Sequence, residues 1–170
     1  MNDLYNLFVT QLRRTYNGER ELVRTFSLLA KRARSEKLKD AFLNHLEETK
    51  RHVNRLETLF GSLKEEPHGA ACTTTKALAD EAEALYRENA DDTSVDAALI
   101  AGGQKIEHYQ IATYGCLQQW ARTLALHSVD DTLHEILEEE KAADRKLSQL
   151  AVEGLNQSAV AGKHSMSLFH

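Results

Sequence analysis

The segment His45-Leu-Glu-Glu-Thr-Lys-Arg-His52 places polar side chains where a helical bundle normally buries apolar ones. Residues three, four and seven apart share one face of an α-helix, so His45, Glu48 and His52 lie together. Leu38 lies seven residues before His45, and Leu59 lies seven after His52, so this face is otherwise apolar. Burying such groups without partners costs about 2 to 7 kcal/mol each. The segment therefore predicts a compensating partner, and a metal ion is the best candidate.

The composition of the chain is typical of helices. It has 170 residues, which predicts one domain. Ala, Leu, Glu, Lys and Arg dominate, and runs of β-branched residues are missing. We therefore expect an all-α fold without a sheet.

Charge and cysteine content narrow the class of protein. A net charge of −5 without a basic block argues against nonspecific nucleic-acid binding. No apolar run approaches the ~20 residues that span a bilayer, and the first residues lack a signal-peptide pattern. The two cysteines, Cys72 and Cys116, have no zinc-site spacing and suit a reducing compartment. We expect a cytoplasmic protein with no nucleic-acid and no membrane partner.

Apolar residues at helical spacing predict four long helices in two antiparallel pairs. The predicted ranges are about 2–33, 36–63, 95–126 and 131–155, with a short helix at 77–89 inside a long crossover at 64–93. Ser35 and Ser94 are the predicted N-caps of the second and third long helices. Gly18, within the first helix, indicates close packing or a bend. Residues 1–156 form the predicted bundle, and 157–170 a flexible tail.

A carboxylate interrupts the apolar stripe of each long helix. Glu19, Glu107 and Glu140 each have an apolar or aromatic residue seven positions before and seven after, so their side chains should point at the core. Glu48 fits this pattern less well, but it lies one turn from both His45 and His52. A single inward Glu is more often a structural ion pair, whereas one on every long helix indicates a shared site.

The chemistry of these groups favours a dinuclear metal site. Carboxylates that face one another repel and raise each other's pKa values, and two divalent cations would neutralise them. Metal-carboxylate bundles take one Glu from each of two helices and Glu-x-x-His from the other two. Oxygen and imidazole ligands without cysteine suit two Fe or Mn ions, with Zn as an alternative. His45 and His52 are ligands or, in the second interpretation, hydrogen-bonding groups of the core.

Several stretches together identify a family. They are Tyr16-Asn-Gly-Glu-Arg-Glu-Leu22, His45-Leu-Glu-Glu-Thr49, Asp96-Ala-Ala-Leu-Ile100, Gln104-Lys-Ile-Glu-His-Tyr109, Ala112-Thr-Tyr-Gly115 and Glu138-Glu-Glu-Lys-Ala-Ala-Asp144. With them the chain resembles the YciE/YciF family of ferritin-like stress-response proteins from residue 7 to about 151. The resemblance implies a ferritin-like four-helix bundle, a homodimer and a candidate dinuclear site.

Carried over residue by residue, the resemblance points to the four Glu residues, with His45 and Asp144 close by. The chain has Gln110 where the family usually has Glu, and His52 where the family usually has Gln. Neither ligand-bearing pair has the Glu-x-x-His spacing, because Glu48 and His52 are four apart, as are Glu140 and Asp144. A four-residue step still keeps both members on one face. Asp144 is a ligand or, alternatively, an exposed helix charge.

The leading hypothesis is a dimetal-carboxylate protein that handles oxygen or peroxide in a stress response. The predicted metal ligands are Glu19, Glu48, Glu107, Glu140, His45, His52 and Asp144. The alternative is a non-enzymatic, dimeric helical stress protein whose buried carboxylates are paired structurally. Tyr114 is predicted mainly to pack in the core, and Glu138 and Glu139 to face solvent. The sequence leaves open whether the protein is an enzyme.

Overall fold

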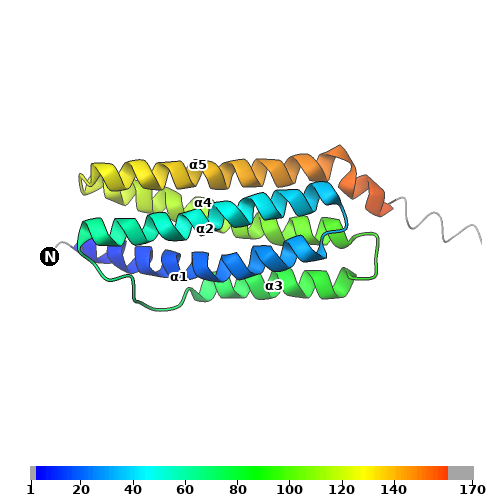
Figure 1. Ribbon diagram of the computed structural model, residues 1–170, viewed down its shortest axis with the longest axis horizontal. Helices are drawn as coiled ribbons and strands as arrows, with labels where there is room; N and C mark the ends of the chain where they lie inside the picture. Colours follow the sequence, from blue (N-terminus) through cyan, green and yellow to red (C-terminus); the bar gives the residue numbers. More distant parts are fainter. Residues whose placement is uncertain (1–2, 161–170) are drawn as a thin grey trace, which may run out of the picture.

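A computed structural model describes residues 3–160, and every regular element in that range is helical. In chain order the elements are α1 (Asp3–Arg32), α2 (Glu36–Leu63), α3 (Thr73–Asn89), α4 (Val95–Thr123), α5 (His127–Leu150) and the π-helical turn η1 (Ala151–Leu155). Figure 1 shows the four long helices running along the long axis of the molecule, with the shorter α3 beside α1. The predicted all-α bundle with a crossover helix is confirmed.

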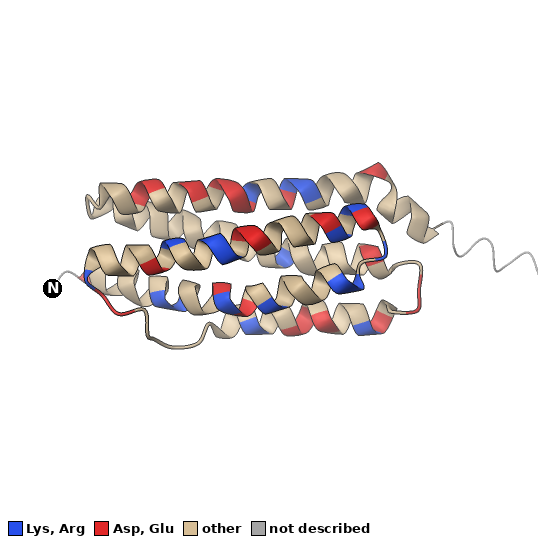
Figure 2. Ribbon diagram, in the orientation of Figure 1, with Lys and Arg blue, Asp and Glu red and all other residues tan. Residues whose placement is uncertain are grey.

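The crossover helix α3 packs against α1 and α4, so it covers the outside of the bundle. The strongest packing within the bundle pairs α1 with α2 and α4 with α5, as the short connections predict. In the part of the chain that the structure describes, no helix is both long and apolar enough to cross a membrane. Acidic and basic segments are interspersed along the long helices (Figure 2).

Helix ends differ from the predicted ones where the backbone turns sharply. Ser35 caps α2 as predicted, because its hydroxyl accepts a hydrogen bond from the backbone N–H of Leu38. Ser94 precedes α4, but its hydroxyl donates to Asn89 instead of capping the helix. Ala125 adopts a φ of 57°, which ends α4 at Thr123 instead of 126 and lets α5 begin at His127 instead of 131.

Two further boundaries lie elsewhere than predicted. Helix α3 begins at Thr73 instead of 77, because the three threonines belong to its first turn and Cys72 takes the capping position. Helix α5 ends at Leu150 instead of 155, and Gly154 interrupts the helical backbone with a φ of 143°. Residues 156–160 are helical again. The rest of the predicted tail, 161–170, lies outside the described residues.

A layer of polar side chains separates two apolar cores. One core contains Phe8, Leu56 and Tyr114, and the other contains Phe26 and Phe42. Every long helix contributes to both cores and carries buried ionisable groups where it passes from one to the other. These groups are Glu19, His45, His52, Glu107 and Glu140. The bundle therefore buries charge near the middle of its length, with apolar packing toward both of its ends.

Three glycines allow close approach between helices. A Cβ atom on Gly18 would lie 2.8 Å from the hydroxyl oxygen of Thr75, so Gly18 marks close packing of α3 on α1. A Cβ atom on Gly102 would lie 2.8 Å from the Cβ atom of Ala82. Gly103 similarly gives room to Phe42 and Leu147.

Gly102 and Gly115 make a matched pair for testing this packing, since both lie in α4 and only Gly102 faces a neighbour within 4 Å. We expect Gly115→Ala to raise the free energy of unfolding by about 0.5 to 1 kcal/mol, because alanine favours the helix. We expect Gly102→Ala to lower it by about 1 to 2 kcal/mol, since the overpacking outweighs that gain. Urea unfolding followed by circular dichroism measures both, and equal gains at the two positions would contradict the close contact.

Candidate metal centre

The four long helices each bring at least one ionisable side chain to the polar layer. Glu19 comes from α1, His45 and His52 from α2, Glu107 from α4 and Glu140 from α5. His45 is 5% exposed and the other four are 0% exposed. These five residues form two groups of potential metal ligands, and Glu140 belongs to both.

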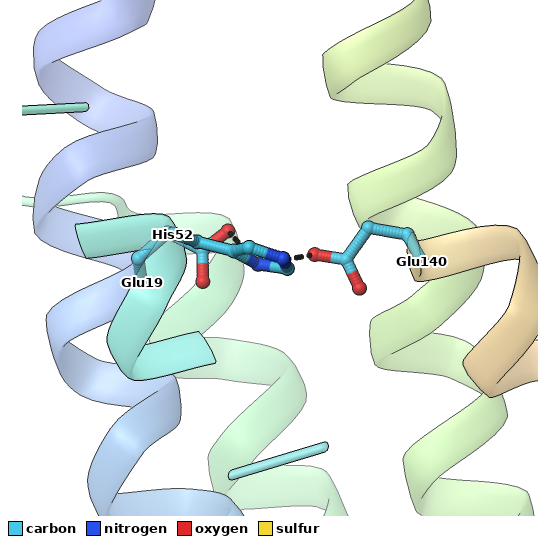
Figure 3. A group of neighbouring side chains, drawn as sticks. All are labelled: Glu19, His52 and Glu140. Carbon is cyan, nitrogen blue, oxygen red and sulfur yellow. Dashed lines mark ion pairs between the residues drawn. The ribbon is translucent and has the colours of Figure 1, made fainter. Parts of the chain in front are cut away.

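The first group consists of Glu19, His52 and Glu140. The Nδ1 atom of His52 lies 3.3 Å from Oε1 of Glu140 and 3.7 Å from Oε1 of Glu19. Figure 3 shows the imidazole of His52 lying between the two carboxylates. The ligand atoms of the group lie within 4.8 Å of one another. Two ligand atoms that each lie ~2.1 Å from one metal ion are about 3 to 4 Å apart. The spacing of this group is therefore close to that of a site for one metal ion.

The second group consists of His45, Glu107 and Glu140. The Nε2 atom of His45 lies 3.1 Å from Oε1 of Glu107 and 3.3 Å from Oε2 of Glu140. The two oxygens of the Glu140 carboxylate therefore face different imidazoles, Oε1 toward His52 and Oε2 toward His45. This is the arrangement in which one carboxylate can bridge two ions.

The donor atoms are poorly satisfied within the protein itself. Both carboxylate oxygens of Glu107 and of Glu140 are buried without a hydrogen-bond partner, as are Oε2 of Glu19 and Nδ1 of His52. Buried polar atoms are paired in almost all native structures. Because these unpaired atoms converge on two points and are oxygen and imidazole donors, they fit divalent cations.

Each histidine is oriented by a carboxylate outside the two groups. His45 donates from Nδ1 to Oε2 of Glu48 at 3.1 Å, which leaves Nε2 facing the interior. His52 donates from Nε2 to Oε2 of Glu139 at 2.7 Å, which leaves Nδ1 facing the interior. The proton is assigned to the ring nitrogen because an ionised carboxylate can only accept. Metal-bound histidines typically have this second partner.

Glu19 is held by two donors, Tyr114 and Gln110, which are not among the predicted metal ligands. The Tyr114 hydroxyl donates to Oε1 of Glu19 at 2.5 Å, and the Gln110 amide donates to the same oxygen at 2.7 Å. Tyr114 does pack in the core as predicted, but its hydroxyl also fixes this ligand. Their helical spacing could have predicted this role, because Gln110 lies three residues and Tyr114 seven residues after Glu107 and so share its helix face.

Three further residues named in the sequence analysis lie outside the two groups. The Glu48 side chain, expected to point at the core, is 30% exposed and joins neither group, because it binds the outer nitrogen of His45. Asp144 also joins neither group, and its carboxylate lies 3.3 Å from Nδ1 of His108. Glu139, predicted to face solvent, instead contacts His52 and Arg55. These three residues lie at the edge of their helix faces, where a helical pattern does not fix whether a side chain points inward.

The buried charges change the pKa values of the cluster. Burial alone would lower the pKa of His52, but the hydrogen bond to Glu139 and the nearby carboxylates of Glu140 and Glu19 raise it to about 11. Burial, followed by repulsion from Glu140, raises the pKa of Glu107 well above its usual value. Burial would also raise the pKa of Glu140, but the two imidazoles lower it. Without bound ions, the site therefore holds protons where cations would lie.

Comparison with known proteins gives a consistent family assignment. The family model described as Domain of unknown function (DUF892) matches residues 3–160. Protein YciF of Escherichia coli (strain K12) is 37% identical over 160 residues, which cover 94% of this chain and 96% of that protein. The crystal structure of the Escherichia coli stress protein YciF matches with a TM-score of 0.87 over 92% of this chain and 99% of that one.

Two other solved structures have the same fold. YcfI from Rhodopseudomonas palustris is 35% identical, with a TM-score of 0.83 over 86% of this chain and 94% of that one. A protein from Xanthomonas campestris pv. campestris is 20% identical, with a TM-score of 0.72 over 98% of this chain and 99% of that one. At 20% identity, the likeness to the Xanthomonas protein shows the fold alone.

The raised pKa of His52 predicts how stability changes with pH in chelator-treated protein. A histidine whose folded pKa lies above its unfolded value of 6.5 stabilises fully below that value. This contribution is lost as the pH rises from 6.5 toward 11. We expect the melting temperature of the metal-free protein to fall across this window, and to fall less in His52→Gln. Thermal melts at successive pH values measure this, and equal slopes in the two proteins would contradict the buried charge on His52.

Proposed function

This chain belongs to the DUF892 family and is similar to the stress protein YciF, and from that premise we propose that it is a dimetal-carboxylate protein. It binds two Fe or Mn ions in the polar layer, one in each group of ligands, and handles oxygen or peroxide in a stress response. Zn is the alternative metal, because imidazole and carboxylate also suit it. The YciF relationship supports the stress role, and the geometry of the polar layer supports the ions.

The observation that carries the proposal is the position of Glu140. Its two oxygens face the inner nitrogens of His45 and His52, each at 3.3 Å, and neither oxygen has a hydrogen-bond partner. Glu19 and Glu107 then complete one ion site each. Paired ions in such sites lie about 3.5 to 4 Å apart, a spacing that a bridging carboxylate can span.

The protein's own residues prepare this site for ligands. Ions bound here would offer open coordination positions and, as Fe or Mn, electrons for the reduction of oxygen or peroxide. Tyr114 and Gln110 hold one oxygen of Glu19 and leave the other free to ligate. Glu48 and Glu139 fix the ring orientation of the two histidines. The two apolar cores cover the polar layer toward both ends of the bundle.

A second candidate function follows from the charge balance without ions. His52 contacts Glu139 at 2.7 Å and Glu140 at 3.3 Å, so a protonated imidazole neutralises part of the cluster. This supports the non-enzymatic helical stress protein, in which the buried carboxylates are structural. The homodimer implied by the resemblance is part of either proposal, and sedimentation equilibrium tests it. A reducing, cytoplasmic location is also proposed, supported by the free thiols of Cys72 and Cys116.

Metal stoichiometry separates the two functions, because the two groups share only Glu140. We expect two ions per wild-type chain, about one in Glu19→Gln, about one in Glu107→Gln and none in Glu140→Gln. Inductively coupled plasma mass spectrometry on protein purified without chelator measures these ratios. If the wild type binds no metal and its melting temperature is unchanged by chelator, the structural function is supported instead.

Two sets of variants serve as controls. Glu138→Gln should retain both ions, since Glu138 lies beside the site on α5 but is exposed and pairs with Lys141. Glu48→Gln and Glu139→Gln should still bind two ions at saturation, but with affinity lowered by about 10- to 100-fold. Loss of all metal in Glu48→Gln would place that carboxylate among the direct ligands.

The chemistry is tested on protein loaded with Fe(II). We expect the wild type to speed the oxidation of Fe(II) by hydrogen peroxide by at least about tenfold over free Fe(II), which corresponds to about 1.4 kcal/mol of barrier. Glu140→Gln should match free Fe(II), because it has lost the shared ligand. Stopped-flow absorbance of Fe(III) follows the reaction. A wild type that holds two ions without any acceleration would argue against the oxidant chemistry while leaving the metal site intact.

A further inference from the structure

One cavity connects the surface of the bundle with the second group of ligands. It has a volume of about 400 Å³ and is lined by α2 and α5, with Glu107 of α4 at its inner end. His45 and Glu107 are the buried ionisable residues of the lining. Glu107 has no hydrogen-bond partner on either carboxylate oxygen. A buried acceptor without a partner therefore borders a space that opens to solvent.

The charged residues of the lining become more acidic with depth. They are Lys37, Asp40, Glu48, Glu107 and Lys146, which leaves a formal excess of one negative charge when His45 is neutral. Both lysines are exposed. The carboxylates range from exposed Asp40 through Glu48, which is 30% exposed, to Glu107, which is 0% exposed. Carboxylates therefore follow the cavity inward, and its inner end has no lysine.

His45 lies between the outer and the inner carboxylate. Its Nδ1 atom is 3.1 Å from Oε2 of Glu48, and its Nε2 atom is 3.1 Å from Oε1 of Glu107. One imidazole ring thus separates a carboxylate that solvent reaches from one that solvent does not reach. Asp40 and Asn44, which also line the cavity, precede Glu48 by eight and four residues and form a row with it along α2. Oxygen-bearing side chains therefore lead from the mouth to His45.

The cavity is large enough for a cation that still carries water. A water molecule occupies about 30 Å³ of liquid, so six of them around an ion occupy about 180 Å³. The volume of the cavity, about 400 Å³, exceeds this. A hydrated cation therefore fits in the cavity before it exchanges water for carboxylate oxygens further in.

The first group of ligands does not border this cavity. Glu19, His52 and Glu140, which Figure 3 shows together, are 0% exposed, and none of the three lines the cavity. Glu140 belongs to both groups, because its Oε1 atom faces His52 and its Oε2 atom faces His45. The shared carboxylate therefore joins the enclosed first group to the group that borders the cavity.

We propose that this cavity is the entry route for the divalent cations of the metal centre, and that it sets the order in which the two sites fill. Asp40 and Glu48 attract the cation at the mouth, and the second group binds it first. Glu140 then transfers it to the first group, which frees the second group for the next cation. This inference rests on the proposed function, because it requires both ion sites.

A larger side chain in the wall of the cavity tests the route. Ala143→Leu should slow the uptake of Co(II) by metal-free protein at least about tenfold, because the filled cavity must first open by a conformational change. Two ions should still bind at saturation. The control is Ala112→Leu on α4, an exposed position outside the cavity, which should match the wild type. Stopped-flow absorbance of bound Co(II) gives the rate, mass spectrometry the final metal content, and circular dichroism the folding.

Charge at the mouth provides a second test, which remains informative if Ala143→Leu does not fold. Asp40→Lys should slow Co(II) uptake at least about threefold at low ionic strength, and Lys146→Gln should speed it about twofold. Both effects should shrink in about 0.5 M salt, because salt screens exposed charges. The control is Glu88→Lys, which makes the same charge change as Asp40→Lys at an exposed position on α3 and should match the wild type.

The order of filling is tested with two variants that should each retain one ion. Glu19→Gln keeps the second group, so its ion should bind as fast as the first ion of the wild type. Glu107→Gln keeps the first group, which the cavity does not reach, so its ion should bind at least about tenfold more slowly. Equal rates in these two variants overturn the order of filling.

The outcomes separate this inference from the proposed function. Wild-type uptake rates in folded Ala143→Leu, or in Asp40→Lys at low ionic strength, overturn the entry route. Two ions at saturation in the same samples then leave the dimetal function standing. A wild type that binds no Co(II) at saturation overturns the dimetal function and the route with it. Slower uptake in both variants, with two ions bound at saturation, supports both.

Discussion

The shared carboxylate of Glu140 is the constraint around which the rest of the bundle is arranged. Its two oxygens face two imidazoles from α2, and two further carboxylates approach from α1 and α4. A cluster of this kind in an apolar interior is unfavourable unless protons or cations balance the charge. The four helices must therefore be aligned along the bundle axis so that these groups lie in one layer, and the apolar cores on either side of the layer maintain this alignment.

The geometry of α2 explains how one helix supplies both imidazoles. His45 and His52 are seven residues apart, which corresponds to about 10.5 Å along the helix axis. Their ring centroids are only 6.3 Å apart, so the two rings lean toward each other. Glu48 binds the outer nitrogen of His45, which is Nδ1, and Glu139 binds the outer nitrogen of His52, which is Nε2. The inner nitrogens are thereby brought close enough for one carboxylate on α5 to face both.

The same arrangement connects the site with the surface. The seam between α2 and α5 is less closely packed than the pairs α1–α2 and α4–α5, and alanines line it beside the second ligand group. The relationship to the stress protein YciF does not by itself identify a substrate. The cavity at this seam is lined by both His45 and Glu107.

The sequence by itself determined the helical class, the pairing of the long helices and the inward direction of Glu19, Glu107, Glu140 and the two histidines. Those features follow from the spacing of apolar residues, which fixes the angle of each side chain around its own helix axis. That spacing carries no information about how far one helix is shifted along another. Only the tertiary structure therefore decided that Glu140 is shared, that Glu48 and Glu139 orient the histidines from outside, and that Tyr114 and Gln110 hold Glu19. These contacts join atoms on different helices or at the edge of a face, where a shift of one turn exchanges one partner for another.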